Sequence, residues 1–281
     1  MKKRIITNEQ INDFKLYLYE EERSENTIAK YIRDILSFSQ RIGSKRLEKT
    51  DMLEYKKELC EKYAPRSVNS ILSAINMFFA FLGWHELKVR TLKIQRQIFA
   101  EKSKELTKAE YVRLLIAAKR NNNSRLYYLL QTMAGTGIRV SEIKYITCEA
   151  VKNGQTVINC KNKIRKIFLP KQLCKMLKAY IREQNIKNGS VFVSKQGRPL
   201  DRSNIWKMLK DLCESANVSK EKVFPHNFRH LFARTYYSLQ KDIVRLADLL
   251  GHSCIETTRI YTVETCDVCC RQIQQLGLLH C

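Results

Sequence analysis

Long apolar runs are missing from this chain of 281 residues. No stretch reaches the ~18 consecutive apolar residues that a membrane-spanning helix needs. The N-terminal stretch MKKRIITNEQ carries charge but has no apolar core, which argues against a signal peptide. The sequence therefore predicts a cytoplasmic protein with no membrane partner.

Acidic residues are also few. The chain has 28 acidic against 51 basic residues, so its formal net charge is +23. The first 100 residues hold 19 basic and 13 acidic side chains, and the remainder holds 32 and 15. An excess of this size, concentrated in the C-terminal part, predicts a polyanionic partner such as nucleic acid rather than an unpartnered basic surface.

Ten cysteines occur without a secretory signal, which favours reduced thiols over a disulfide framework. Cys266, Cys269, Cys270, His280 and Cys281 raise the alternative of a zinc site. The first three also fit one face of a helix, where free cysteine behaves as a small apolar side chain. Because the remaining two ligands are adjacent and terminal, we expect no metal site.

The length suits two domains. Residues 1–87 predict four amphipathic helices, which open at Thr7, Ser24, Thr50 and Pro65. They form a small all-α domain that, taken alone, could equally be a generic helical bundle.

A basic segment follows, and we assign residues 88–102 to a linker. Its first part, KVRTLKIQRQI, has four basic residues and no acidic one. Lys88, Arg90, Lys93 and Arg96 are our candidates for contacts to DNA phosphates, with binding driven by counterion release. A merely flexible linker is the alternative.

Residues 103–281 predict a second domain that is mostly helical with a small sheet. Strands are expected at 156–160, 164–169 and 191–193, and helices at 171–184 and 203–215. The fold class is therefore mainly α with a small β-sheet.

The chemistry gathers between Pro225 and Tyr261. Pro225 favours a helix start, which places His226 and Arg229 on one helix face. A second helix runs to Leu250, and Gly251 fits its C-terminal cap, with His252 at the corner. Ser253 and Glu256 predict a capping box, so that Tyr261 would lie in roughly the third turn of a further helix.

Two histidines, an arginine and a tyrosine form a coherent set for phosphoryl chemistry. Arginine grips non-bridging oxygens, histidine relays protons and tyrosine can attack. Upstream, GTGIRVSEI adds Arg139 in an otherwise apolar neighbourhood. Histidines at helix starts are usually structural, however, and we interpret His230 either as a packing residue or as one that supports the site from behind the residues that would touch the phosphate.

The order Arg139, His226, Arg229, His252, Tyr261, in the motifs GTGIRVSE, HNFRH, LLGHS and TTRIYT, resembles the tyrosine recombinase (phage integrase) family. The resemblance covers essentially the whole chain. It implies a core-binding (SAM-like) N-terminal domain, residues 1–87, and a catalytic domain, residues 103–281.

The resemblance also implies roles for these residues. Tyr261 would attack a DNA phosphodiester and form a 3′-phosphotyrosyl link, while Arg139 and Arg229 hold the phosphate. His226 would assist proton transfer, His252 would hydrogen-bond the phosphate, and Glu142 would orient Arg139. No cofactor is implied.

The family's lysine, which protonates the leaving oxygen, falls in CKNKIRKIFLP, where a basic turn precedes an R-x-V-P-L-like strand. Lys163 is the best match, but the turn lacks the family's glycines and is one residue short, so Lys161 remains an alternative.

The partners implied are double-stranded DNA with short inverted-repeat sites and a homotetramer on two duplexes, linked by exchange of the apolar C-terminal tail. We expect integration, excision or inversion of a mobile or invertible element. The alternatives are chromosome-dimer resolution, a type IB topoisomerase-like activity, a non-catalytic DNA-binding relic and a zinc-stabilised regulator.

Overall fold

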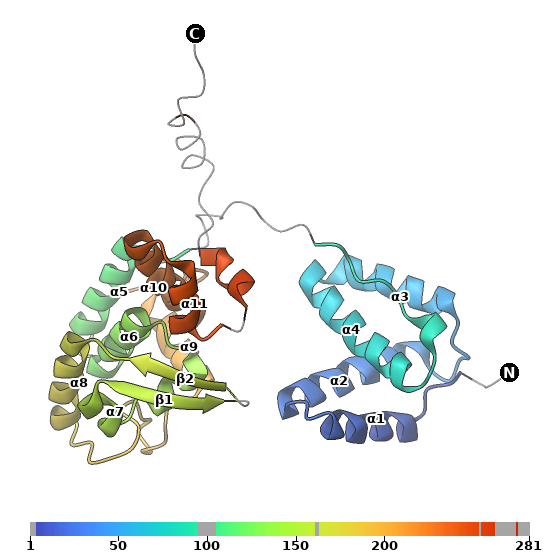
Figure 1. The fold of residues 1–281 in the computed structure, drawn as a ribbon, viewed down its shortest axis with the longest axis horizontal. Helices are drawn as coiled ribbons and strands as arrows, with labels where there is room; N and C mark the ends of the chain where they lie inside the picture. The colour runs from blue at the N-terminus through green and yellow to red at the C-terminus, as the bar shows by residue number, and fades with distance from the viewer. Residues whose placement is uncertain (1–3, 95–104, 161–162, 253, 262–273, 275–281) are drawn as a thin grey trace, which may run out of the picture. The chain divides into compact units, whose positions relative to one another are not determined.

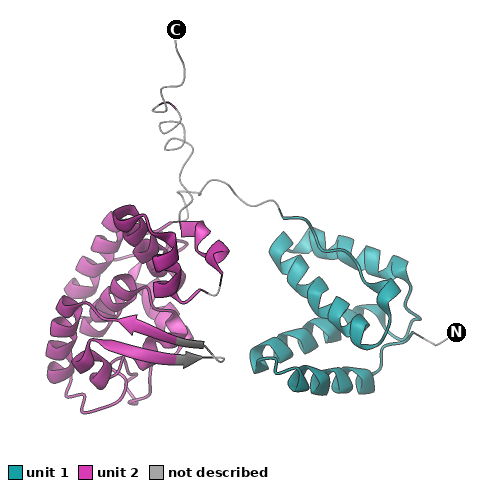
Figure 2. Cartoon of the chain, viewed as in Figure 1, with its two compact units in different colours: residues 1–96 teal, residues 97–281 magenta. Residues whose placement is uncertain are grey.

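The computed structural model describes residues 4–94, 105–160, 163–252, 254–261 and 274, without the side chains of residues 159, 160, 163 and 164. The chain divides into two compact units, residues 1–96 and 97–281 (Figure 2), which we describe one at a time.

Unit 1 is helical. Its elements are α1 (Asn8–Glu20), α2 (Glu25–Ile42), α3 (Lys49–Lys62), α4 (Pro65–Phe81) and the 3₁₀ turn η1 (His85–Leu87). The helices enclose one core, whose largest fully buried side chains include Phe14, Phe38, Phe78 and Phe79.

Most of the predicted helix starts in unit 1 are confirmed. Thr7 caps α1 in a reciprocal capping box, and Ser24 accepts a hydrogen bond from the backbone of Thr27. The expected cap at Thr50 is wrong, because α3 begins one residue earlier, at Lys49. There the Asp51 carboxylate accepts the backbone N–H of Glu48 at 2.8 Å and closes the box around Glu48 instead.

The segment after η1 is fastened to α4 by two asparagines. Asn76 donates to the Val89 carbonyl and accepts its N–H, and Asn69 does the same for Leu92, at 2.7–3.0 Å. Val89 is buried while Arg90 is exposed. The start of the segment assigned to a linker therefore lies on unit 1 in a fixed, alternating conformation.

Unit 2 combines helices with one hairpin (Figure 1). In chain order, its elements are α5 (Lys108–Arg120), α6 (Ser124–Thr136), η3 (Val140–Tyr145), α7 (Cys148–Asn153), β1 (Gln155–Cys160), β2 (Lys163–Phe168), α8 (Lys171–Glu183), α9 (Arg202–Leu212), α10 (Pro225–Gln240), α11 (Ile243–Leu250), η4 (Ile255–Thr257) and η5 (Arg259–Tyr261).

The sheet has two antiparallel strands, with Ile158 opposite Arg165. The third strand expected at 191–193 is wrong. Its backbone pairs locally instead, since Val191 N–H donates to Ile146 and the Phe192 carbonyl accepts from Leu200. Isolated bridges result at Ser190 and Val193. The fold class, mainly α with a small β-sheet, is confirmed.

The end of the described chain also differs from expectation. After Gly251 the backbone forms two 3₁₀ turns, η4 and η5, rather than one helix, and Tyr261 is the last residue of η5. The Cys254 side chain caps nothing, and Ser253 lies outside the described residues. Nowhere in the part of the chain that the structure describes is a helix both long and apolar enough to cross a membrane.

Candidate active site

Arg139 is presented by a tight corner between α6 and η3. Helix α6 ends on Gly137, whose φ of +61° is left-handed. A Cβ atom there would lie 2.5 Å from Cδ1 of Phe232 on α10, so only glycine allows the two elements to approach this closely. The corner sets Arg139 at the start of η3 with 40% of its side chain exposed.

The buried carboxylate of Glu142 holds Arg139 in place. This carboxylate is 5% exposed and accepts Nη1 of Arg139 at 2.9 Å through Oε1. Oε2 accepts the backbone N–H of Arg139 at 2.9 Å. The other terminal nitrogen, Nη2, donates to the Gly251 carbonyl at 3.0 Å. Arg139 is thus bound on its inner side and open on its outer side.

Arg229 projects from the first turn of α10 into the protein and is 2% exposed. Nη1 donates to the Gly137 carbonyl at 2.7 Å, and Nη2 donates to the Leu250 carbonyl at 2.6 Å. Nη2 also lies 2.9 Å from Nε2 of His252. Because its carbonyl partners belong to α6 and α11, Arg229 joins three separate helices.

The hydrogen bonds fix the tautomer of His252. A guanidinium has no acceptor, so Nε2 of His252 must accept from Arg229. Nδ1 then carries the proton and donates to Oγ1 of the fully buried Thr258 at 2.8 Å. His252 is therefore neutral in the DNA-free protein, with its lone pair directed at an arginine.

Tyr261 lies beside both histidine-bearing elements and is 3% exposed. Its ring stacks on His252 with centroids 5.9 Å apart, and it meets the edge of His230 at 4.7 Å. His230 in turn contacts the ring of His226 at 4.6 Å. The structure thus brings His226, Arg229, His252 and Tyr261 together, with His230 between two of them.

The cluster contains more positive than negative side chains, and burial together with this excess shifts the pKa values of its members. Burial, and then the charges of Arg139 and Arg165, lower the pKa of Arg229 to about 10, although the nearby Tyr261 hydroxyl opposes the shift. Burial, followed by the charges of Arg229, Arg139 and Arg165, lowers the pKa of His252 to about 4. Burial, followed by His226 and Arg229, does the same for His230.

His226 lies at the exposed start of α10. Partial desolvation by the surrounding protein, with Arg229 and then Arg139, lowers its pKa too. Burial first, and the neighbouring positive charges second, disfavour a further proton on each of the three histidines and so favour their neutral form. An anion placed among them would reverse that effect, so the arrangement is suited to binding a phosphate.

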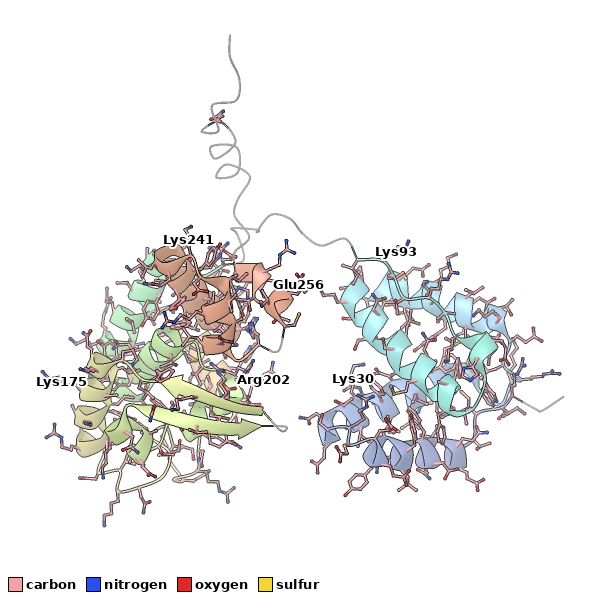
Figure 3. The ribbon with its side chains drawn as sticks, in the orientation of Figure 1. Lys30, Lys93, Lys175, Arg202, Lys241 and Glu256 are labelled. Carbon is pink, nitrogen blue, oxygen red and sulfur yellow. The ribbon has the colours of Figure 1, made fainter. Side chains whose placement is uncertain are left out.

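Lys163 is the first residue of β2, opposite Cys160, and its side chain is not described. Lys161 lies outside the described residues, as do Arg96 and the five terminal cysteine and histidine residues considered for zinc. Of the other basic candidates, Arg90 and Lys93 are exposed, and Lys93 projects away from unit 1 (Figure 3). No group of three metal-ligating side chains occurs in the described part of the chain.

Sequence reasoning passed over Arg165 and Thr258 and left His230 as a packing or supporting residue. Arg165 had a visible signal: alternation along β2 places it on the same side as the buried Ile167, where an apolar residue is expected. Thr258 had none, since its role depends on the turn that folds it under His252.

Comparison with known proteins gives the family. The model of the "Phage integrase family" matches residues 104–266, and that of the "Phage integrase, N-terminal SAM-like domain" matches residues 11–86. The chain is 31% identical to the tyrosine recombinase XerA of Pyrococcus furiosus, over 100% of this chain and 98% of that protein. It is 30% identical to the tyrosine recombinase XerD of Halalkalibacterium halodurans, over 85% of this chain and 87% of that protein.

Solved structures agree. A crystal structure of XerA recombinase is 25% identical, with a TM-score of 0.54 over 98% of this chain and 100% of that one. A lambda integrase (75–356) dimer bound to a COC′ core site has the same fold, with a TM-score of 0.74 at 16% identity over 91% of this chain and 94% of that one. On the family model and on identity along its full length, the chain belongs to the phage integrase family of tyrosine recombinases.

Proposed function

We propose that this protein is a site-specific DNA recombinase that cuts and rejoins strands through a phosphotyrosyl intermediate. The observation that carries the proposal is the cluster that Arg139, Arg229, His252 and Tyr261 form from separate parts of unit 2, in which two guanidiniums, an imidazole and a phenol lie close together. Family membership supports the same chemistry.

In the proposed reaction, the Tyr261 oxygen attacks the scissile phosphorus and its proton leaves with the help of His226. The bond to the 5′-oxygen breaks, and Lys163 supplies the proton to that oxygen. Arg139 and Arg229 neutralise the non-bridging oxygens as charge builds on them. Attack by a 5′-hydroxyl on the phosphotyrosine reverses these steps, so the bond energy is conserved and no cofactor is needed.

His252 would change its bonding when the phosphate enters. Nε2 now accepts from Arg229 and cannot donate. A phosphate that attracts Arg229 away, and raises the pKa of His252 by its negative charge, would let Nε2 take up a proton and donate it to an oxygen. His252 would then contact the phosphate only in the DNA complex.

Covalent trapping tests the proposal. On a nicked duplex that loses its 5′-hydroxyl fragment after cleavage, the unaltered protein should accumulate a DNA-linked species that Tyr261→Phe does not form. Tyr261→Phe should still shift the duplex in a gel. DNA binding without any covalent product, on a duplex that contains the mapped site, would favour the non-catalytic relic.

The general acid is proposed to be Lys163, and its assignment can be tested with a bridging 5′-sulfur in place of the leaving oxygen. A thiolate leaves without a proton, so Lys163→Ala should cleave the oxygen substrate roughly 10²–10⁴-fold more slowly and the sulfur substrate at nearly the normal rate. If Lys161→Ala shows this pattern instead, the role moves to Lys161.

The DNA partner is proposed to carry short inverted repeats, contacted in part by Lys88, Arg90, Lys93 and Arg96. Arg90 and Lys93 are exposed and belong to the segment that Asn69 and Asn76 hold on α4, which supports their contact with DNA. The protein would act on DNA in the cytoplasm. A footprint that extends to distant arm sites would contradict short sites.

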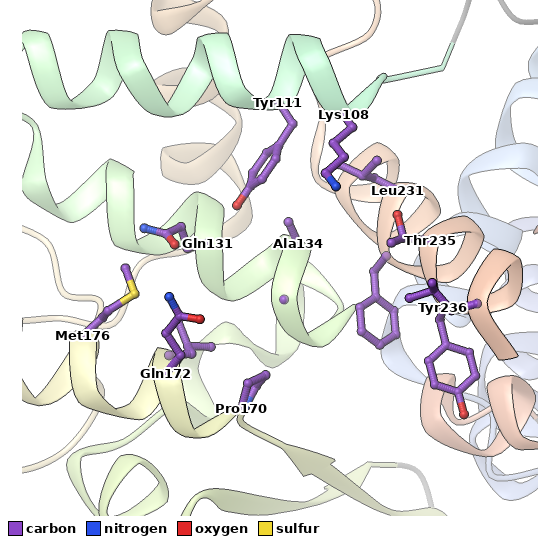
Figure 4. Close-up of a pocket in the computed structure, with 14 residues that line it drawn as sticks. Lys108, Tyr111, Gln131, Ala134, Pro170, Gln172, Met176, Leu231, Thr235 and Tyr236 are labelled. Carbon is purple, nitrogen blue, oxygen red and sulfur yellow. The ribbon is translucent and has the colours of Figure 1, made fainter.

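The proposed assembly is a tetramer on two duplexes, joined by tails that pass between neighbours. Residues 262–281 are rich in apolar side chains, including Leu276, Leu278 and Leu279. Unit 2 has a cavity of about 440 Å³ between α5, α6, α8 and α10, into which Tyr111 and Gln131 point (Figure 4). An apolar tail of another copy would suit this cavity.

Two variants test tail exchange. Deleting residues 265–281, or replacing the cavity-lining and 74% exposed Leu239 with Glu, should leave single-site binding intact and prevent assembly of two duplexes. The exposed Leu16 of α1 offers a matched control, Leu16→Glu. Normal assembly after the tail deletion would rule out exchange.

Two biological roles are open to such an enzyme. We favour integration, excision or inversion of a mobile or invertible element. Chromosome-dimer resolution is the second candidate, because relatives named XerA and XerD match the chain along most of their length. Sequencing the genomic DNA trapped on the protein separates them: sites that flank its own gene support the first role, and a single distant chromosomal site supports the second.

A further inference from the structure

Arg165 is a charged residue on the buried side of β2, the side that also carries Ile167. It lies in the middle of β2, opposite the buried Ile158, and is 8% exposed. Burial lowers the pKa of its guanidinium, Glu142 partly offsets this, and Nε has no hydrogen-bond partner among the residues that the structure describes. A buried arginine is costly unless its fork makes specific bonds.

The fork makes two such bonds, and both lead to the active site. Nη1 donates to Oε2 of Glu142 at 2.8 Å, and Nη2 donates to the Leu249 carbonyl at 2.9 Å. Glu142 holds Arg139 through its other oxygen, and Arg139 reaches the Gly251 carbonyl. The bonds form a closed loop that ties β2 and η3 to the end of α11.

The aliphatic part of Arg165 contributes a steric contact as well. Gly251 has a left-handed φ of +63°, and a Cβ atom there would lie 2.4 Å from Cδ of Arg165. The arginine stem thus lies directly against the residue that precedes His252. Arg165 therefore fixes the position of the C-terminal end of α11 in two ways, by packing against Gly251 and by its hydrogen bond to Leu249. Because Arg165 is buried, it is not available for direct contact with DNA.

We propose that Arg165 is a positioning residue, which holds Arg139 through Glu142 and holds the His252 corner in place for the phosphate. The inference rests on the proposed recombinase function. Without Arg165, Oε2 of Glu142 loses its charged partner and keeps only the backbone N–H of Arg139, so the carboxylate is held less firmly in the orientation that binds the Arg139 side chain. Arg139 and His252 would then lose their alignment for the phosphate, although every group that touches the phosphate is still present.

The test measures single-turnover cleavage of the nicked duplex, affinity for DNA and thermal stability for each variant. Arg165→Met keeps the length and removes the fork, and we expect cleavage to slow by roughly 10–100-fold, as misalignment of reacting groups does. Arg165→Lys keeps a charge that can reach one of the two acceptors, so it should recover part of the rate. DNA affinity should stay within about threefold of normal, because Arg165 is buried.

Arg125 offers a matched control. It is a partly buried arginine of unit 2 that donates to the Val193 carbonyl at 2.8 Å, away from the cluster. Arg125→Met should lower the thermal midpoint and leave the cleavage rate normal. Equal loss of cleavage in the Arg125 and Arg165 variants would reduce the effect to general stability and overturn the proposal.

A double-mutant cycle identifies the route of the effect. If Arg165 acts through Arg139, adding Arg165→Met to Arg139→Lys should slow cleavage by less than about threefold further, whereas independent effects would multiply. Full multiplication overturns the proposal, as does normal cleavage by Arg165→Met. If Arg165→Met fails to fold, the same cycle is run with Arg165→Lys. A covalent product from the unaltered protein is required first, and its absence would count against the proposed function instead.

Discussion

The two units bury charge in opposite ways. In the described part of unit 1, the buried charged side chains are Asp34 and Asp51. The partly exposed Lys30 and Lys45 neutralise them, and Arg33 lies 3.8 Å from Asp34 as well. These pairs serve the helices, since Asp51 also caps α3.

In unit 2, the described buried charges are Glu142, Arg165 and Arg229, and the half-exposed Arg139 joins them. The cluster thus holds one carboxylate against three guanidiniums, of which Arg139 and Arg165 bind it directly. Each buried carboxylate of unit 1 has a lysine partner, so no further charge is needed there. The buried cluster of unit 2 instead carries an excess of positive charge, which an incoming anion would stabilise. The difference supports the proposed phosphate site without reference to any motif.

Among tests of this contrast between the units, the largest effect should come from Arg229. Arg229→Lys removes a fork that bonds two backbone carbonyls and faces the proposed phosphate, so the cleavage rate should fall roughly 10²–10³-fold. Arg234→Lys is the matched control, since Arg234 lies on the same helix but pairs with Glu105. Single-turnover trapping measures both, and similar losses would mean that the charge on α10 matters more than its placement.

The glycine caps of unit 2 allow a second contrast. Gly154 and Gly251 both cap helices in the left-handed region, but a Cβ at Gly154 would meet only a carbonyl at 4.0 Å. Gly154→Ala should cost about 1–2 kcal/mol of unfolding free energy from backbone strain. Gly251→Ala should cost about 1–3 kcal/mol more, because its methyl group meets Arg165.

Denaturant unfolding measures these costs, and trapping measures activity. Gly251→Ala should also cleave slowly, while Gly154→Ala should cleave at the normal rate once folded. Normal cleavage by Gly251→Ala would show that the corner tolerates displacement.

Acidification should weaken the two units in different pH ranges. His230 and His252 have folded-state pKa values of about 4, below the ordinary 6.5, so the unfolded chain binds more protons between these values. Unit 2 should therefore lose stability as the pH falls from 6.5 to 4, by at most about 1.4 kcal/mol per pH unit for each histidine.

In unit 1, hydrogen bonds from Lys45 and from the Glu48 backbone lower the pKa of Asp51 below 3.8, so its contribution is lost only as the pH falls below that value. Hydrogen exchange, which resolves the units separately, should detect unit 2 opening first. His230→Gln should make the decline of unit 2 shallower. Loss of both units in the same pH range would contradict the assignment of neutral histidines.

The smallest effect concerns the segment on α4. Replacing Arg90 or Lys93 with Ala should reduce the slope of log affinity against log salt by about 1 for each phosphate that the protein no longer neutralises. Lys175, an exposed lysine of α8 (Figure 3), provides the control, and Lys175→Ala should leave the slope unchanged. A titration of duplex binding against salt distinguishes these cases.

Local signals predicted much of the fold, because they act over a few residues. The helix caps at Thr7 and Ser24, and the helix start at Pro225, needed only neighbours in the chain. The predictions that were wrong depended on competition. The Asp51 side chain, rather than Thr50, bonds the backbone at the start of α3. The backbone of residues 191–193 bonds to loop residues instead of to a strand.

For the candidate site, the sequence predicted the identity and order of Arg139, His226, Arg229, His252 and Tyr261, since motif spacing is a property of the chain alone. It also placed His226 and Arg229 on one helix, because residues three apart share a face. It left the choice between Lys161 and Lys163 open, because the hairpin turn is shorter than the pattern it was compared with.

Only the tertiary structure decided how these residues are held. Arg165 meets Glu142 across 23 residues of chain, and Arg229 meets His252 across 23. Whether such groups touch depends on how closely helices and strands approach, which here depends on bare glycines at Gly137 and Gly251. The sequence determines which groups are available for phosphate chemistry, and packing decides their tautomer, charge and alignment, because these depend on neighbours that are distant along the chain.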